Sequence, residues 1–118
     1  MKKILITGGA GYIGSKLVNK LLDLNYKVTV VDILKFSSKS INHLFNNKNF
    51  KFIKGDVRNY KLISKLVKSN EFIIPLAALV GAPLCAKNKR EAISTNLESI
   101  KLMMKIISRK NKIIYLTT

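Results

Sequence analysis

The residues of this chain best placed to do chemistry are the glycines that follow its first apolar run. Gly8, Gly11 and Gly14 recur at three-residue intervals, and Gly9, Gly11 and Gly14 also satisfy the G-x-G-x-x-G spacing of dinucleotide-binding folds. Glycine lets the chain turn sharply off a strand, lets backbone N–H groups approach a pyrophosphate, and lets a helix start close to the sheet. The N-terminus of that helix adds unpaired N–H groups and a partial positive charge. The pattern therefore predicts a strand, a phosphate-binding loop and a helix.

A carboxylate further along the chain supports this interpretation. Asp32 closes the next apolar strand, 18 residues after Gly14, which is near the spacing expected of a ribose-binding carboxylate. Tyr12 and Ile13 would begin the helix over the phosphates. The glycines alone could form an ordinary strand-to-helix turn, but their combination with a strand, a helix and this carboxylate favours dinucleotide binding.

The elements that must position these residues alternate along a single domain, residues 1–118. Apolar runs predict strands at 2–7, 27–32, 50–54, 71–76 and 112–118, and helical spacing predicts helices around 13–24, 62–67 and 89–109, with a short one over 41–46. Strands that alternate with helices require right-handed parallel crossovers. We therefore predict an α/β fold, a Rossmann-type doubly wound parallel sheet of strand order 3-2-1-4-5. A cofactor would lie across the carboxyl ends of the strands, at the reversal between strands one and four.

The helix predicted over 89–109 is apolar on more than one side. One predicted face, which would pack on the sheet, comprises Ile93, Leu97, Ile100, Met104 and Ile107. Leu102, Met103 and Ile106 extend the apolar surface round the side, which is more than one sheet contact needs.

At the other end of the chain, Asn25 should end the first long helix because asparagine tolerates a left-handed backbone.

Composition narrows the function classes. The net charge is +16, from 22 basic and 6 acidic residues. Lysines spread along the chain favour a solvated surface over a nucleic-acid reader, which would bring more arginines and stacking aromatics, although the charge alone permits one. No window approaches the ~18 apolar residues of a membrane span, and no signal peptide is visible, so we expect a soluble, cytoplasmic protein. His43 and Cys85 have no partners in metal-ligand spacing, so we expect no metal site.

Two motifs carry a family resemblance. The segment from Thr7 to Gly14, Thr-Gly-Gly-Ala-Gly-Tyr-Ile-Gly, resembles the cofactor loop of the extended short-chain dehydrogenase/reductases, which include the NAD-dependent nucleotide-sugar epimerases and dehydratases. Gly55-Asp56-Val57-Arg58 resembles the short acidic motif of that family. The resemblance implies that Asp56 accepts a hydrogen bond from the adenine amino group, although Asp56 could also cap the helix that follows.

The resemblance extends to the ends of the fourth and fifth strands. Ala77 and Ala78 would line the route toward the nicotinamide, although Pro75 stands where the family usually has histidine. Asn96 resembles an asparagine that supports the active-site hydrogen-bond network, or it bonds locally in its helix. Thr118 would offer a hydroxyl to the reacting oxygen and is the catalytic candidate. The cofactor-binding residues so implied are Gly8, Gly11, Tyr12, Ile13, Gly14, Asp32, Asp56, Val57, Leu76, Ala77, Ala78 and Asn96.

The resemblance implies NAD as the cofactor and nucleotide sugars as substrates. NADP is less favoured because Asp32 would repel a 2′-phosphate and Lys35 is the only nearby basic residue. Family chemistry requires a tyrosine with a lysine four residues later, and the only such pair, Tyr12 and Lys16, lies at the phosphate loop and its helix.

We therefore expect the NAD-binding portion of a nucleotide-sugar epimerase or dehydratase, a partial chain without the substrate-binding part, whose hydride transfer needs a longer chain. The family also implies a homodimer through the helix at 89–109. The alternative is a non-catalytic dinucleotide-binding module that senses redox state.

Overall fold

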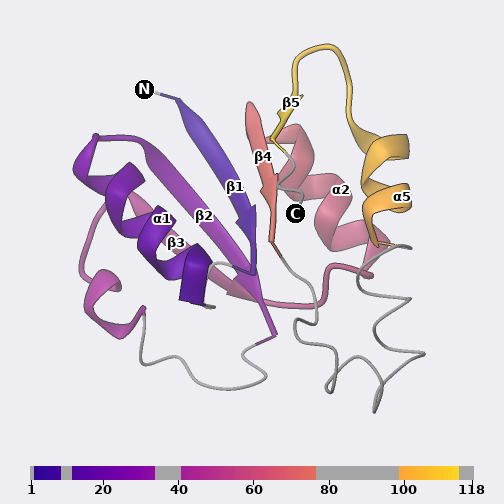
Figure 1. Cartoon of the computed structure of the whole chain (residues 1–118). Helices are drawn as coiled ribbons and strands as arrows, with labels where there is room; N and C mark the ends of the chain where they lie inside the picture. The colour runs from indigo at the N-terminus through magenta and orange to yellow at the C-terminus, as the bar shows by residue number, and fades with distance from the viewer. Residues whose placement is uncertain (1, 9–11, 34–40, 77–98, 115–118) are drawn as a thin grey trace.

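The computed structural model describes residues 2–8, 12–33, 41–76 and 99–114 (Figure 1). Within these residues, strands and helices alternate as the apolar patterns predict. Their order is β1 (Lys3–Thr7), α1 (Tyr12–Asp23), β2 (Lys27–Asp32), a short 3-10 helix η1 (Asn42–Leu44), β3 (Phe50–Lys54), α2 (Tyr60–Lys68), β4 (Phe72–Pro75), α5 (Ser99–Ile106) and β5 (Lys112–Ile113). The first four strands match their predicted bounds to within one residue at each end.

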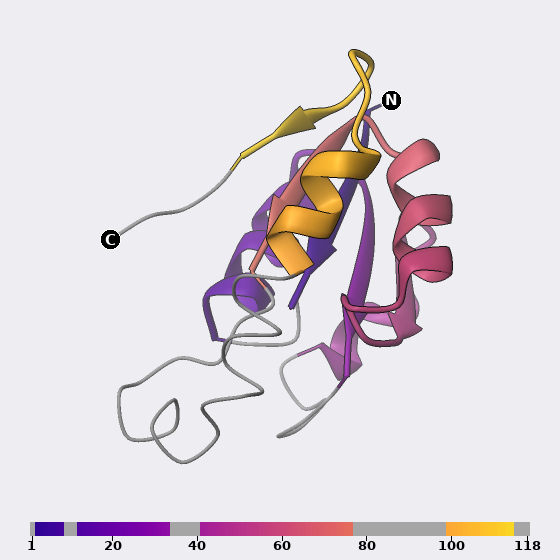
Figure 2. The ribbon, with the colours of Figure 1, turned by 90° about the vertical axis from the view of Figure 1, so that its right-hand side faces the viewer.

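The five strands form one parallel sheet in the order β3-β2-β1-β4-β5, which confirms the predicted topology. In Figure 2 the sheet lies between two layers, with α1 against one face and α2 and α5 against the other. Because parallel strands are joined by crossovers, helices cover both faces and the central strands are buried on both sides. β1 illustrates this, since Ile4, Leu5 and Ile6 are all buried.

Two apolar clusters fill the two interfaces, and alternate residues of each strand serve them in turn. Ile4 and Ile6 join Val18 and Leu22 of α1 in one cluster. Leu5 joins the other cluster, with Met103 of α5. Helical spacing predicts that α2 buries Leu62, Ile63, Leu66 and Val67; the last three are buried in this cluster and Leu62 packs against it partly buried. The sheet is therefore held on both faces, and the carboxyl ends of its strands keep a common edge.

The ends of α1 show how local sequence bounds the helix. Asn25 has a φ of 66°, the left-handed conformation expected of it. Its N–H donates to the Leu22 carbonyl, and the Tyr26 N–H donates to the Leu21 carbonyl, so the last carbonyls of the helix are satisfied. Helical spacing would place Ile13 and Leu24 in the stripe that packs on the sheet, but they are 62% and 55% exposed.

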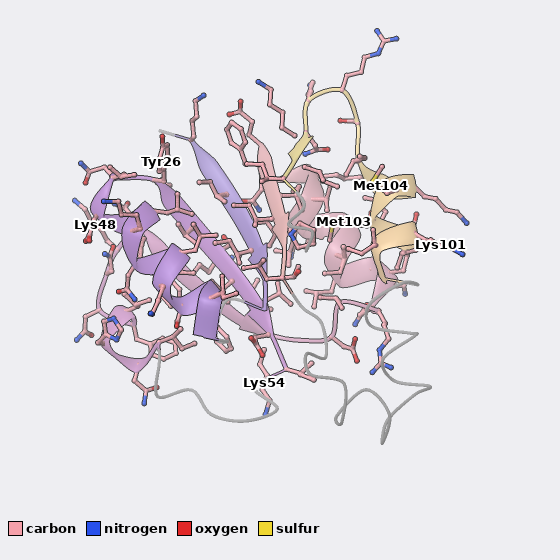
Figure 3. The ribbon with its side chains drawn as sticks, viewed as in Figure 1. Tyr26, Lys48, Lys54, Lys101, Met103 and Met104 are labelled. Atoms are coloured by element: carbon pink, nitrogen blue, oxygen red, sulfur yellow. The ribbon has the colours of Figure 1, made fainter. Side chains whose placement is uncertain are left out.

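The prediction for α5 was wrong in its end and in part of its buried face. Ile107 of the predicted face packs against the second cluster as expected, but Met104 does not. The helix ends at Ile106 rather than at 109, and its start before Ser99 lies outside the described residues. Met103 is 2% exposed, whereas Met104, expected on the buried face, is 55% exposed (Figure 3). Ile106 also packs against the second cluster rather than forming an uncovered side. Contact with α2 selects this face, and a helix that is apolar on two sides could not reveal which side would meet α2.

β5 is shorter in the described region than the predicted strand at 112–118. Lys112 and Ile113 pair with Phe72 and Ile73 of β4, and the Ile114 N–H donates to the Ile73 carbonyl. Residues 115–118 lie outside the described part of the chain.

Candidate cofactor site

Three backbone hydrogen bonds gather the carboxyl ends of four neighbouring strands. The Gly8 N–H donates to the Val31 carbonyl at 2.7 Å, and the Leu76 N–H donates to the Thr7 carbonyl at 2.8 Å. The Gly55 N–H donates to the Asp32 carbonyl at 3.1 Å. The residues that follow β1, β3 and β4 are thus each tied to an adjacent strand. In doubly wound sheets this edge is where ligands bind.

The described part of the chain after β1 ends on a glycine in the left-handed region. Gly8 has a φ of 78°, a conformation that glycine adopts without strain. α1 begins four residues later at Tyr12, and its first turn contains no acidic residue. The positive end of the helix therefore meets no negative side chain of its own and can stabilise an anion. Gly14 is buried in this first turn, as a close helix–sheet contact requires.

Asp32 ends β2 at the same edge, one strand away from the Gly8 turn. It lies opposite Lys54 of β3 in the strand register, and Lys54 extends from that edge in Figure 3. The sequence had suggested Lys35 as the only nearby cation, and pairing of β2 with β3 adds Lys54. Strand pairing alone brings this lysine beside Asp32, so no local pattern could have identified it.

Asp56 follows β3 and is held by Arg58. The Arg58 N–H donates to Oδ1 at 2.8 Å, Nε donates to Oδ1 at 2.9 Å and to Oδ2 at 3.1 Å, and Nη2 donates to Oδ2 at 2.6 Å. These bonds hold the pKa of Asp56 below its ordinary value, although partial burial opposes the shift. The carboxylate is therefore ionised at neutral pH.

Asp56 does not cap α2. The cap is Asn59, whose side chain accepts the Leu62 N–H at 3.2 Å. The alternative structural role for Asp56 is thus filled by another residue. Gly55, just before it, packs so closely that an added Cβ would clash with Cδ2 of Leu62.

Of the remaining predicted site residues, Val57 and Leu76 lie in the described part of the chain and five others do not. Val57 is buried in the second apolar cluster, so it can reach a ligand only through its backbone. Leu76 is partly buried against the first cluster. Five predicted residues lie outside the described part of the chain: Gly11, Ala77, Ala78, Asn96 and Thr118.

The described residues contain no group of three or more His, Cys, Asp or Glu that could hold a metal ion. His43 instead places Nε2 2.8 Å from Oδ1 of Asn19, which ties η1 to α1. No helix in the described ranges is both long and apolar enough to cross a membrane.

The strand order and the crossovers define a doubly wound α/β protein of the Rossmann type. The chain belongs to the NAD-dependent epimerase/dehydratase family, whose model matches residues 4–118. A protein of Methanocaldococcus jannaschii with the name uncharacterized membrane protein is 35% identical over 97 residues, which are 81% of this chain and 29% of that protein.

Two epimerases are also similar. UDP-glucose 4-epimerase of Rickettsia bellii is 32% identical over 124 residues, covering 99% of this chain and 36% of that protein. The structure of UDP-glucose 4-epimerase of Thermotoga maritima with UDP-glucose has a TM-score of 0.82 at 26% identity, covering 96% of this chain and 37% of that one. The chain thus spans about a third of the length of these relatives.

Proposed function

We propose that this chain binds NAD along the carboxyl edge of its sheet, as the cofactor-binding part of an oxidoreductase that acts on nucleotide sugars. The observation that carries this proposal is the convergence of three features on one edge: the left-handed Gly8 turn before α1, the Asp32 carboxylate and the Asp56 carboxylate. Membership of an NAD-dependent family supports it.

Each feature has a physical role in this proposal. The backbone at Gly8 and the first turn of α1 hold the pyrophosphate, and Asp32 accepts hydrogen bonds from the adenosine ribose. Asp56 accepts a hydrogen bond from the adenine amino group, beside the backbone of Val57. Toward the other end of the cofactor, the proposed residues are Leu76, Ala77, Ala78, Asn96 and Thr118.

We expect NAD to bind more tightly than NADP, because the Asp32 carboxylate repels a 2′-phosphate. Lys54, opposite in the register, partly offsets that repulsion. Calorimetric titration should give a preference of about tenfold or more, equivalent to ~1.4 kcal/mol. Asp32→Asn should reduce the preference for NAD over NADP, because it removes the repelling charge. Lys54→Met should increase this preference, because it removes the offsetting charge. Equal or tighter binding of NADP by the unaltered chain would refute the role of Asp32.

We expect the 118 residues to bind NAD without turning over nucleotide sugars. The only tyrosine with a lysine four residues later is Tyr12, with Lys16, in the first turns of α1. A tyrosine near its ordinary pKa of ~10 is a poor base at neutral pH without a suitably placed cation. An assay of UDP-glucose with NAD tests this, and measurable turnover would show that other residues transfer the proton.

We further propose a homodimer formed through α5, the described part of the helix predicted at 89–109. Its support is the apolar surface on the two flanks of α5, where Met104 is exposed and Leu102 is partly exposed. Light scattering at high concentration should show association that Met104→Lys reduces. A monomer at all concentrations would contradict this interface.

A further inference from the structure

Asp56 and Arg58 form a two-point contact in which one guanidinium grips both carboxylate oxygens. The backbone N–H of Arg58 adds a third donor, which fixes the turn between the two residues. The side chains are 37% and 39% exposed, so the pair stands at the surface and a ligand can reach it. Such an exposed pair contributes little to stability on average, and its defined orientation is the more informative feature.

The hydrogen bonds occupy the two oxygens unequally. Oδ1 accepts the backbone N–H of Arg58 and the shorter Nε contact, at 2.8 and 2.9 Å. Oδ2 accepts Nη2 at 2.6 Å and only the longer part of the shared Nε contact, at 3.1 Å. A carboxylate has about four acceptor positions, so Oδ2 retains the greater capacity for one more donor.

The place of this oxygen on the sheet edge suggests its ligand. From the Gly8 turn, the strand order leads to Asp32 at the end of β2 and then to Asp56 after β3. A dinucleotide whose pyrophosphate lies at Gly8 and whose ribose lies at Asp32 extends its base toward the end of β3. Adenine carries an exocyclic amino group there, which is a hydrogen-bond donor.

We propose that Arg58 is a positioning residue of the adenine subsite, which orients the Asp56 carboxylate so that Oδ2 accepts the adenine amino group. This inference rests on the proposed binding of NAD. Arg58 itself does not touch the base in this arrangement. Its role is to hold a charged acceptor in a single direction, which makes the subsite selective for an amino group over a carbonyl oxygen at the same position.

The test compares NAD with nicotinamide hypoxanthine dinucleotide, in which a carbonyl oxygen replaces the adenine amino group. Calorimetry on the whole chain measures both dissociation constants for the unaltered protein and for Arg58→Lys, which keeps the charge but loses the two-point grip. Arg109→Lys is the matched control, because it makes the same change on an exposed residue between α5 and β5.

The unaltered chain and Arg109→Lys should prefer NAD by about tenfold or more, the effect of one hydrogen bond to a charged group. In Arg58→Lys the preference should fall to about threefold or less, mainly through weaker NAD binding. A merely structural role for Arg58 would weaken both ligands equally and leave the ratio unchanged, which would overturn the inference. Tighter NAD binding by Arg58→Lys would overturn it too, because Arg58 would then block the carboxylate.

The test also separates this inference from the proposed function. If the unaltered chain binds both dinucleotides equally, NAD binding stands and the role of the Asp56–Arg58 pair is refuted. If it binds neither, the proposed function fails and the inference fails with it.

Discussion

Asn111 should be a key residue for stability, because its side chain joins two connections that are far apart in sequence. Nδ2 donates to the Asn70 carbonyl at 2.7 Å and to the Val67 carbonyl at 2.9 Å, both at the end of α2. Oδ1 accepts the Ser108 N–H at 2.9 Å. The next residue, Lys112, donates its N–H to the Glu71 carbonyl and begins β5. Asn111 therefore fixes the start of β5 beside β4.

The expected cost of Asn111→Ala follows from these bonds. Three well-formed hydrogen bonds at about 1 kcal/mol each, reduced because the site is only partly buried, give a loss of about 2 kcal/mol in the free energy of unfolding. Asn111→Asp should cost at least as much, because it places a carboxylate oxygen against two carbonyl oxygens.

Urea unfolding followed by circular dichroism measures this loss, and a two-state fit gives the midpoint and slope. Asn47→Ala is the matched control, because Asn47 is exposed and, within the described residues, its side chain accepts only a local hydrogen bond from the Asn49 N–H. The control should lose about 0.5 kcal/mol or less. If Asn111→Ala cost no more than the control, the bridge between the two connections would not contribute to stability and the reasoning would be refuted.

Three further predictions concern the fold and the site. Met103→Ala should lower the free energy of unfolding in urea by about 2–4 kcal/mol, whereas Met104→Ala should change it by about 0.5 kcal/mol or less, because of the two only Met103 is buried. Equal losses would contradict the assigned face. Asn25→Ala should cost about 1 kcal/mol while Asn25→Gly costs little, since the left-handed conformation strains alanine, and equal melting of the two variants would argue against that strain. By NMR, the Asp56 carboxyl should titrate below 3.8, and Arg58→Met should raise that pKa. Because the folded pKa is the lower one, the stabilisation from this pair is full above pH 3.8 and is lost as the pH falls through the folded value; an unmoved midpoint would show that Arg58 is not the cause.

Much of the candidate site could be predicted because it depends on topology. Gly8, Asp32 and Asp56 each follow an apolar run, and parallel strands joined by helices must place such residues at one edge. That these three residues bind a cofactor remains a prediction. The position of Lys54 opposite Asp32 was not predictable, since it depends on the register of β2 and β3. Arg58, by contrast, stands only two residues after Asp56.

The sequence by itself determined the elements and their order. Apolar runs marked the strands, helical spacing marked the helices, and Asn25 marked the end of α1, because each of these depends on a few adjacent residues. Only the tertiary structure decided the inward face of α5, the hydrogen bonds of Asn111 and the cap of α2 at Asn59. The inward face of α5 and the bonds of Asn111 depend on which distant segment packs alongside. The cap depends on which of two nearby polar side chains meets the end of α2. Periodicity within one segment carries no information on these contacts.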